Sequence, residues 1–175
     1  MVTKKTFREV APNGDPLVQL QKDTYIVENF TNSKDIIELK EGNIKNKVQV
    51  RCCQNSKISI GTKVNSIIAD NCVGCILLVN SVIASVEIVN CDNITIQVTG
   101  IVPTISIDKC NKVDIYVSEE SKQVEIYSSK SSEMNLLTPG DEEGDWNEFV
   151  IPEQFVSKLS LSKGKIESVP SPLYG

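Results

Sequence analysis

The sequence predicts an all-β fold, a right-handed parallel β-helix with a C-terminal β-hairpin, and three observations lead to this prediction. Apolar residues recur every 19 positions over residues 48–136. Each period holds two short runs in which apolar and polar residues alternate, as in half-buried strands. No stretch of this region has the length and 3.6-residue periodicity of a helix. Two short strands per 19-residue coil describe a solenoid whose equivalent strands stack in parallel, with right-handed crossovers.

The 19-residue period is clearest in four cysteines, and apolar ladders at the same step are expected to form the columns of the core. Strand stacking predicts a rise of about 4.8 Å from one coil to the next. The cysteines are Cys53, Cys72, Cys91 and Cys110. The apolar ladders are Val48, Ile67, Val86, Ile105, Val124; Val50, Ala69, Ile88, Ile107, Ile126; Ile58, Leu77, Ile96, Ile115, Met134; and Ile60, Val79, Val98, Val117, Leu136.

The chain before the repeat is expected to form a looser first coil or two. Strand-like runs occur at 24–27, 36–39 and 47–50, spaced more widely than those of the repeat. Residues 1–20 are irregular and contain Pro and Gly, so we expect them to cap the first coil. The β-helix is therefore predicted to cover residues 1–137.

Beyond the repeat we expect a loop over residues 138–150, then a hairpin and tail over residues 151–175. Alternating runs at 155–161 and 165–169 are separated by a three-residue turn sequence that contains Gly. A solenoid end leaves strand edges and core residues uncovered. The hairpin could cover the end of its own chain or that of a second subunit, which would give a two-fold dimer.

The composition argues against several function classes. The sequence contains no His, only two Arg (Arg8 and Arg51) and 5% aromatic residues, and its net charge is -5. Without His, Ser-His-Asp and Cys-His catalysis lack their base, and a negative chain is a poor partner for nucleic acid or anionic membrane. The start of the chain shows no secretory signal, which predicts a cytoplasmic protein with reduced cysteines. We expect no enzyme activity and no cofactor.

Three local patterns could suggest chemistry, and each has a simpler explanation. Cys72-Val73-Gly74-Cys75 has the spacing of a zinc or redox motif, but Cys72 belongs to the 19-residue ladder and a second chelating pair is missing. The acidic segment 141–145 lacks the ligand pattern of a calcium loop. Glu87 and Glu125 would lie about 9.6 Å apart by strand stacking, without an aromatic sugar platform. We therefore expect no metal site and no glycosidase site.

The outward positions of the predicted strands are candidates for a flat protein-binding surface. Isolated exposed apolar residues are common, however, so the pattern alone favours such a surface only weakly. On the first sheet these positions are Gln49, Ile68, Glu87, Ser106 and Glu125, and on the second they are Ser59, Leu78, Gln97, Tyr116 and Asn135.

Four segments resemble the C-terminal domain of cyclase-associated proteins, in the same order and at compatible spacing across nearly the whole chain. Any one of them would be a weak signal, whereas the four together are specific. The segments are Lys63-Val64-Asn65-Ser66-Ile67-Ile68-Ala69-Asp70-Asn71-Cys72, Gly100-Ile101-Val102-Pro103-Thr104-Ile105-Ser106-Ile107, Lys130-Ser131-Ser132-Glu133-Met134-Asn135 and Asn147-Glu148-Phe149-Val150-Ile151-Pro152-Glu153-Gln154-Phe155.

The resemblance implies a β-helix of about six coils whose C-terminal hairpin is exchanged between two subunits. It also implies binding of monomeric actin, with preference for the ADP form, exchange of that ADP for ATP, and actin recycling together with cofilin. Carried over by position, the actin-binding residues would be Lys63, Asn65, Ser66, Ile68, Asp70, Glu87, Ser106, Glu133 and Asn135. The dimerisation residues would be Phe155, Val156, Leu159, Leu161, Ile166 and Val169.

Two alternatives remain open at the level of sequence. The related β-helix domain of tubulin-folding cofactor C activates GTPases through an arginine finger, and Arg51 is the residue placed to act as one. A purely structural dimerisation module would form a tight dimer without affinity for actin. The final residues, Ser171-Pro172-Leu173-Tyr174-Gly175, also differ from the small-residue ending of the actin-binding family.

Overall fold

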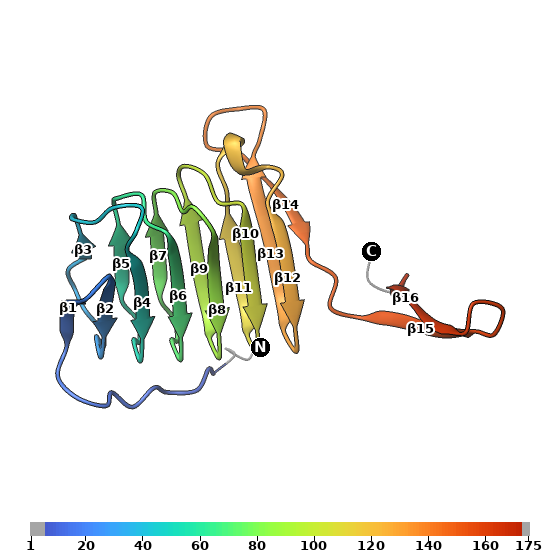
Figure 1. The fold of residues 1–175 in the computed structure, drawn as a ribbon, viewed down its shortest axis with the longest axis horizontal. Coiled ribbons are helices and arrows are strands. Elements are labelled where there is room, and N and C mark those ends of the chain that lie inside the picture. The colour runs from blue at the N-terminus through green and yellow to red at the C-terminus, as the bar shows by residue number, and fades with distance from the viewer. Residues whose placement is uncertain (1–5, 173–175) are drawn as a thin grey trace, which may run out of the picture.

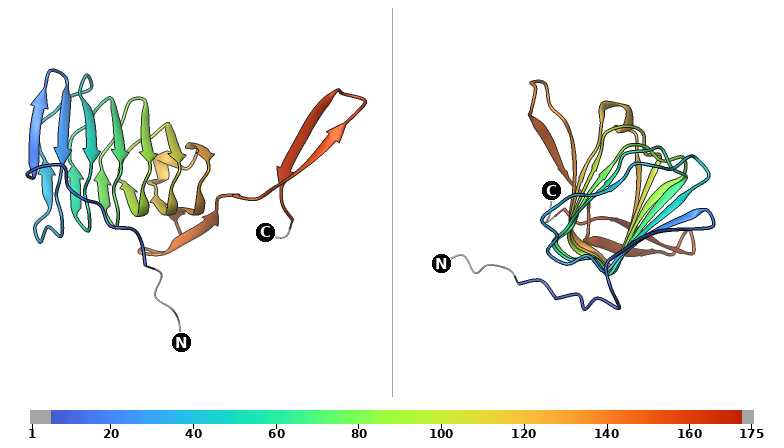
Figure 2. Two further views of the ribbon diagram at one scale, coloured as in Figure 1. Left: turned by 90° about the horizontal axis from the view of Figure 1, so that it is seen from below. Right: turned by 90° about the vertical axis from the view of Figure 1, so that its left-hand side faces the viewer.

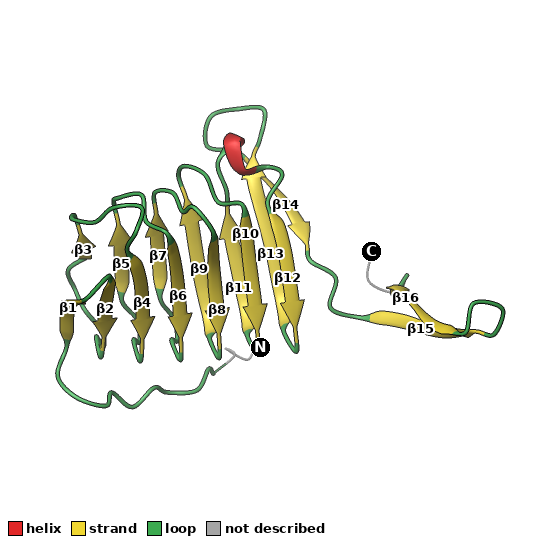
Figure 3. Cartoon of the chain, in the orientation of Figure 1, coloured by secondary structure: helices red, strands yellow, loops and turns green. Residues whose placement is uncertain are grey.

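The protein is a right-handed parallel β-helix with a C-terminal hairpin that extends away from it (Figure 1), which confirms the predicted fold class. This computed structural model describes residues 6–172, so the first residues of the expected N-terminal cap and the last three of the tail lie outside it. Almost all its regular structure is strand (Figure 3), apart from the 3₁₀ helix η1 (Glu119–Ser121). Within residues 6–172 no helix is long and apolar enough to cross a bilayer.

The chain alternates between two seven-stranded sheets, so that each coil contributes one strand to each sheet. Six coils result, from β2–β3 to β12–β13. In spatial order the first sheet contains β1 (Leu17–Gln21), β2 (Thr24–Glu28), β4 (Lys47–Arg51), β6 (Ser66–Asp70), β8 (Ser85–Val89), β10 (Thr104–Asp108) and β12 (Glu125–Ser129). The second contains β3 (Ile37–Leu39), β5 (Lys57–Ile60), β7 (Ile76–Val79), β9 (Asp92–Val98), β11 (Asn111–Tyr116), β13 (Ser132–Pro139) and β14 (Trp146–Val150).

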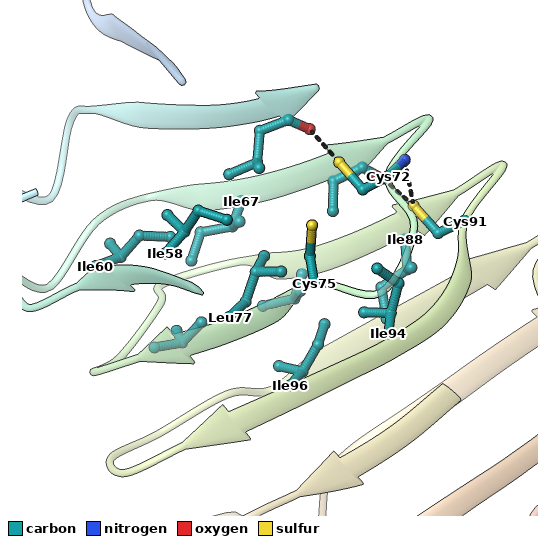
Figure 4. Packing of buried hydrophobic residues seen from close by; sticks show 14 of the residues in the cluster. Ile58, Ile60, Ile67, Cys72, Cys75, Leu77, Ile88, Cys91, Ile94 and Ile96 are labelled. Carbon is teal, nitrogen blue, oxygen red and sulfur yellow. Dashed lines mark hydrogen bonds between the residues drawn. The ribbon is translucent and has the colours of Figure 1, made fainter. Parts of the chain in front are cut away.

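The core consists of the predicted columns of branched aliphatic residues. Ile58 pairs in register with Leu77, Leu77 with Ile96, and Ile96 with Ile115, and all four are fully buried. Figure 4 shows these columns from the two sheets packed against one another, with Cys72 and Cys91 at the side of the core where the chain turns from one sheet to the other. Alternation along each strand puts every second side chain into this interior, and stacking repeats the pattern in each coil.

The 19-residue step holds from β4 to β11 and fails at the last coil, which corrects part of the predicted ladders. Ile105 pairs with Ile126 rather than Val124, and Ile115 pairs with Leu136 rather than Met134, a step of 21 residues. The cause is a longer connection between β11 and β12, which contains η1. The two predicted outward rows therefore end with Tyr127 and Leu137, in place of Glu125 and Asn135.

Each coil passes from the first sheet to the second at a short turn, and together these turns form the tight-turn edge of the β-helix. Two columns of left-handed residues flank this edge. The first contains Cys52, Asn71, Asn90, Lys109 and Lys130, and the second contains Asn55, Gly74, Asn93, Lys112 and Glu133, each with φ between 46° and 65°. Asn and Gly tolerate this conformation best, which explains why they recur at these positions.

Residues 6–16, the N-terminal strap, run along the tight-turn edge from the later coils back to β1 beside the first coil (Figures 1 and 2). Of the expected cap, β1 does border the first coil, because it pairs antiparallel with β2. The strap instead contacts several coils: Asn13 bonds to Asn29, and Arg8 forms an ion pair with Asp92. The proline and glycine residues of this segment indicate an irregular backbone, but they do not indicate which part of the β-helix the segment packs against.

The segment 138–150, predicted as a loop, contains the strand β14, which pairs antiparallel with β13. The acidic, Gly-containing residues before β14 form the connection, and Trp146 packs edge-on against Tyr116 with ring centroids 4.9 Å apart. The predicted hairpin is present as β15 (Phe155–Ser160) and β16 (Lys165–Pro170). Figures 1 and 2 show it projecting beyond β14, away from the core.

Candidate functional site

The strand β6 lies at the centre of the candidate surface. Alternation buries Ile67 and Ala69 completely and turns Ile68 and Asp70 outward, where both are half-buried. Ser66, expected as a contact residue, points to the same side but is only 8% exposed. The connection before β6 carries the exposed Lys63 and the half-buried Asn65. The backbone of Asn65 is fixed on both sides: its N–H donates to the Asn46 carbonyl at 2.7 Å, and its carbonyl accepts a hydrogen bond from the Ala84 N–H.

Neighbouring strands extend this surface into a row, hereafter the sheet-1 row. Ile68 pairs with Glu87, and Glu87 with Ser106, so the three side chains lie one strand spacing apart, about 4.8 Å. Tyr127 continues the row and is 59% exposed. Its hydroxyl donates to the Glu125 carboxylate at 3.0 Å, and this bond raises the pKa of Tyr127. The 19-residue repeat did not indicate Tyr127, because the last coil is 21 residues long and shifts the register by two.

Asp70 links the sheet-1 row to the tight-turn edge. Its Oδ1 accepts a hydrogen bond from Asn90 Nδ2 at 3.2 Å. Asp70 and Asn71 also line a surface groove of about 780 Å³ together with the start of β1 and the strap residues before it. The groove is open to solvent and polar, so it offers a recess for a side chain of a partner rather than an enclosed active site.

Arg51, the candidate arginine finger, lines the same groove but is already engaged. Its guanidinium Nε donates to the Glu28 carboxylate on the neighbouring strand. The Arg51 side chain is 45% exposed and that of Glu28 19% exposed. An arginine finger must place an unpaired cation on a phosphate, so the ion pair with Glu28 would have to break first.

Glu133 and Asn135 lie apart from the other candidates, on β13 of the second sheet. Asn135 Nδ2 donates to Asp114 Oδ1 at 3.0 Å, and the Glu133 backbone N–H donates to the Glu153 carboxylate. The nine predicted residues therefore divide into seven on or beside the first sheet and two on the second. Side-chain direction follows from strand alternation, but the sequence could not relate the two sheets in space.

The six cysteines are free and buried. Cys72 stacks in the predicted column, where its N–H donates to Cys91 Sγ at 3.4 Å, and Gly74 of the Cys-x-x-Cys segment serves the left-handed turn. Hydrogen bonds with the neighbouring thiols raise the pKa of Cys72, and burial of the thiol raises it further. Within residues 6–172 no group of three or more Cys, Asp or Glu side chains could hold a metal ion.

The candidate dimerisation residues are all exposed on the hairpin. Val156 pairs with Val169 on one face of the ribbon, and Leu159 with Ile166 on the other. Apolar residues on both faces of an isolated ribbon would leave apolar surface in contact with water, which is unfavourable. A lone two-stranded hairpin is also only marginally stable in water. Their exposed fractions are 56% for Phe155, 36% for Val156, 62% for Leu159, 84% for Leu161, 60% for Ile166 and 58% for Val169.

Fold and surface together define the class: a parallel β-helix domain with a flat, polar sheet face and a projecting apolar hairpin. The family described as "Adenylate cyclase associated (CAP) C terminal" matches residues 14–172. The chain therefore belongs to the family of cyclase-associated protein C-terminal domains, which confirms the resemblance found in the sequence.

Individual relatives agree with this assignment. Adenylyl cyclase-associated protein 2 from Homo sapiens is 43% identical over 148 residues, which are 85% of this chain and 30% of that protein. The adenylyl cyclase-associated protein of Dictyostelium discoideum is 40% identical over 165 residues, 94% of this chain and 35% of that protein. The chain thus spans about a third of the length of these relatives. A crystal structure of cyclase-associated protein from Cryptosporidium parvum superposes with a TM-score of 0.93 at 68% identity, covering 94% of this chain and 100% of that one.

Proposed function

We propose that this protein binds monomeric actin, preferentially in the ADP form, and promotes exchange of the bound nucleotide. One observation carries the proposal: in a domain of this family, most of the predicted actin-binding residues share one surface, on β6, β8, β10 and the connection before β6. The protein would act in the cytoplasm, in association with the actin cytoskeleton, on actin that cofilin has released from ageing filaments.

Exchange by this route requires no covalent step on the chain. A protein that binds an open, nucleotide-loosened conformation of actin more tightly than the closed one shifts actin toward the open form. The shift cannot exceed the difference in affinity for the two conformations. A rigid surface suits this role, because it can hold actin in one conformation. The β-helix provides such a surface, since the strands of the sheet-1 row also carry fully buried residues such as Ile67 and Ile88.

Specificity would come from local contacts rather than from overall attraction. Both this chain, with a net charge of -5, and actin are acidic, so long-range electrostatics oppose association. Lys63 is exposed next to the row and can offer a local positive charge, while Ile68 and Glu87 supply an apolar and an acidic contact. Short-range complementarity of this kind fixes orientation on the partner.

We infer that the hairpin is exchanged between two subunits. A partner's hairpin could cover the open C-terminal end of the core, where Val124, Ile126, Leu136 and Ile151 are only partly buried. The exchange would bury the apolar residues on the ribbon faces and, by two-fold symmetry, would cover both ends in one step. The resulting homodimer would present two sheet-1 rows and hold two actin monomers.

A titration of monomeric ADP-actin tests the proposal. Substituting Lys63→Ala and Asn65→Ala together is expected to weaken binding at least about tenfold, since each removes a contact worth on the order of 1 kcal/mol. Lys57→Ala, on the second sheet, removes a similar charge from the other side and should leave affinity unchanged. Unaltered affinity of the folded double variant would remove these two residues from the site. No binding by the unsubstituted protein would leave the two alternatives, a GTPase activator that uses Arg51 or a structural dimerisation module.

A further inference from the structure

The N-terminal strap is bound through its own side chains. Arg8 donates from Nε to Asp92 Oδ2 at 2.8 Å, from Nη1 to Asn71 Oδ1 at 2.6 Å, and from Nη2 to the Asn90 carbonyl. These acceptors belong to successive coils, so a single guanidinium bridges them. Phe7 lies nearby, with Lys112 Nζ 5.8 Å from its ring centroid.

The middle of the strap contributes an apolar anchor and two backbone bonds. Val10 is 6% exposed and packs with Cys52 and Val73 in a small cluster separate from the main core. The Val10 N–H donates to Gln54 Oε1 at 2.9 Å, and the Asn13 N–H donates to Asn29 Oδ1 at 3.0 Å. The strap is therefore held mainly by side chains of the β-helix and joins neither of its sheets.

The strap borders Asp70 on two sides. Arg8 and Asp70 line one groove of about 500 Å³ at the tight-turn edge. The residues that follow, from Asn13 to Leu17, line the larger groove with Asp70 and Arg51. Because Arg8 also occupies the Asn71 side chain, a partner that approaches this corner of the sheet-1 row meets the strap.

We propose that the strap is a displaceable autoinhibitory element that covers the Asp70–Asn71 corner and lifts when a partner binds the sheet-1 row. This inference rests on the actin-binding function proposed above. Displacement uncovers one buried side chain, that of Val10, and breaks the three bonds of Arg8, whose side chain is 41% exposed, and the backbone bonds of Val10 and Asn13, while the two sheets stay intact. Segments with so few buried contacts open locally without global unfolding. The closed strap lowers the apparent affinity for the partner by the fraction of molecules that are open.

Two strap variants of the full chain test this inference, Arg8→Ala and the double variant Arg8→Ala with Val10→Ser. Lys45→Ala, an exposed residue in the connection between β3 and β4, is the matched control for loss of a positive charge. Hydrogen exchange at the Val10 and Asn13 amides reports strap opening. We expect opening to increase about five- to tenfold for Arg8→Ala, more for the double variant, and not for the control.

The same variants are then titrated with monomeric ADP-actin. We expect affinity to rise by the same factor as strap opening, up to the point at which the strap is fully open. Faster hydrogen exchange of the strap amides with unchanged or weaker actin binding would overturn the inference. Unchanged hydrogen exchange in the double variant would also overturn it. If neither the unsubstituted chain nor the released variants bind actin, the proposed function itself fails, whereas binding only after release would support both.

Discussion

Replacing Ile96 by Ala should destabilise the protein strongly, because Ile96 is fully buried in the middle of a core column. The substitution removes three carbon groups beyond Cβ, which amounts to about 2.4 kcal/mol of lost transfer free energy. The neighbouring Leu77 and Ile115 are held one strand spacing away by the ladders on both sides, so the site can collapse little. An unfilled cavity adds about 1–2 kcal/mol, for a total near 4 kcal/mol.

Guanidinium chloride unfolding followed by circular dichroism measures this free energy. All variants are compared at one protein concentration, because hairpin exchange would make apparent stability depend on concentration. Ile83→Ala is the matched control: Ile83 is 45% exposed, so the same transfer estimate gives a cost of about 1.3 kcal/mol with no enclosed cavity. A loss below about 2 kcal/mol for Ile96→Ala, or one equal to that of the control, would refute the rigid-column reasoning.

Three further substitutions or treatments test the turns, the thiols and the hairpin. Gly74→Ala should lower the free energy of unfolding by more than about 1–2 kcal/mol in the same assay, because φ is +65° and the new Cβ would lie 2.3 Å from Asn55 Oδ1. Gly164→Ala is the control for the backbone cost alone, since Gly164 has φ +61° and nothing within 4 Å of the new Cβ. Iodoacetamide at pH 8 should modify the native cysteines at least about tenfold more slowly than the urea-unfolded ones, since all six thiols are buried and the reagent cannot reach them in the folded protein, and equal rates would contradict the buried column. Leu159→Asp should convert a hairpin-exchanged dimer into a monomer in light scattering, and a dimer that survives would place the interface elsewhere.

The central coils were predictable from sequence because every coil repeats the same local rule. Alternation decides which side chains enter the core, and stacking forces equivalent positions such as Ile67 and Val86 into register. The rule failed where the connection containing η1 adds two residues, since a repeat cannot reveal an insertion at its last copy. It also failed for β14, whose pairing with β13 is a long-range choice that the acidic residues before it concealed.

The candidate site was predictable only as far as strand direction. Sequence placed Ile68, Glu87 and Ser106 on one face, and the structure has them there. It did not foresee the strap across the tight-turn edge, because a segment without periodicity carries no signal of what it packs against. Arg8 beside Asp92, 84 residues away, is a contact that only the folded chain defines.

The decisive measurement for the proposed function is the rate of nucleotide release from ADP-actin monomers as this protein is added. We predict a saturable acceleration whose half-point agrees with the binding titration and which the Lys63→Ala, Asn65→Ala double variant shifts to higher concentration. Binding that slows release would indicate an actin-sequestering domain. An unchanged release rate, with no binding in the same titration, would contradict the account.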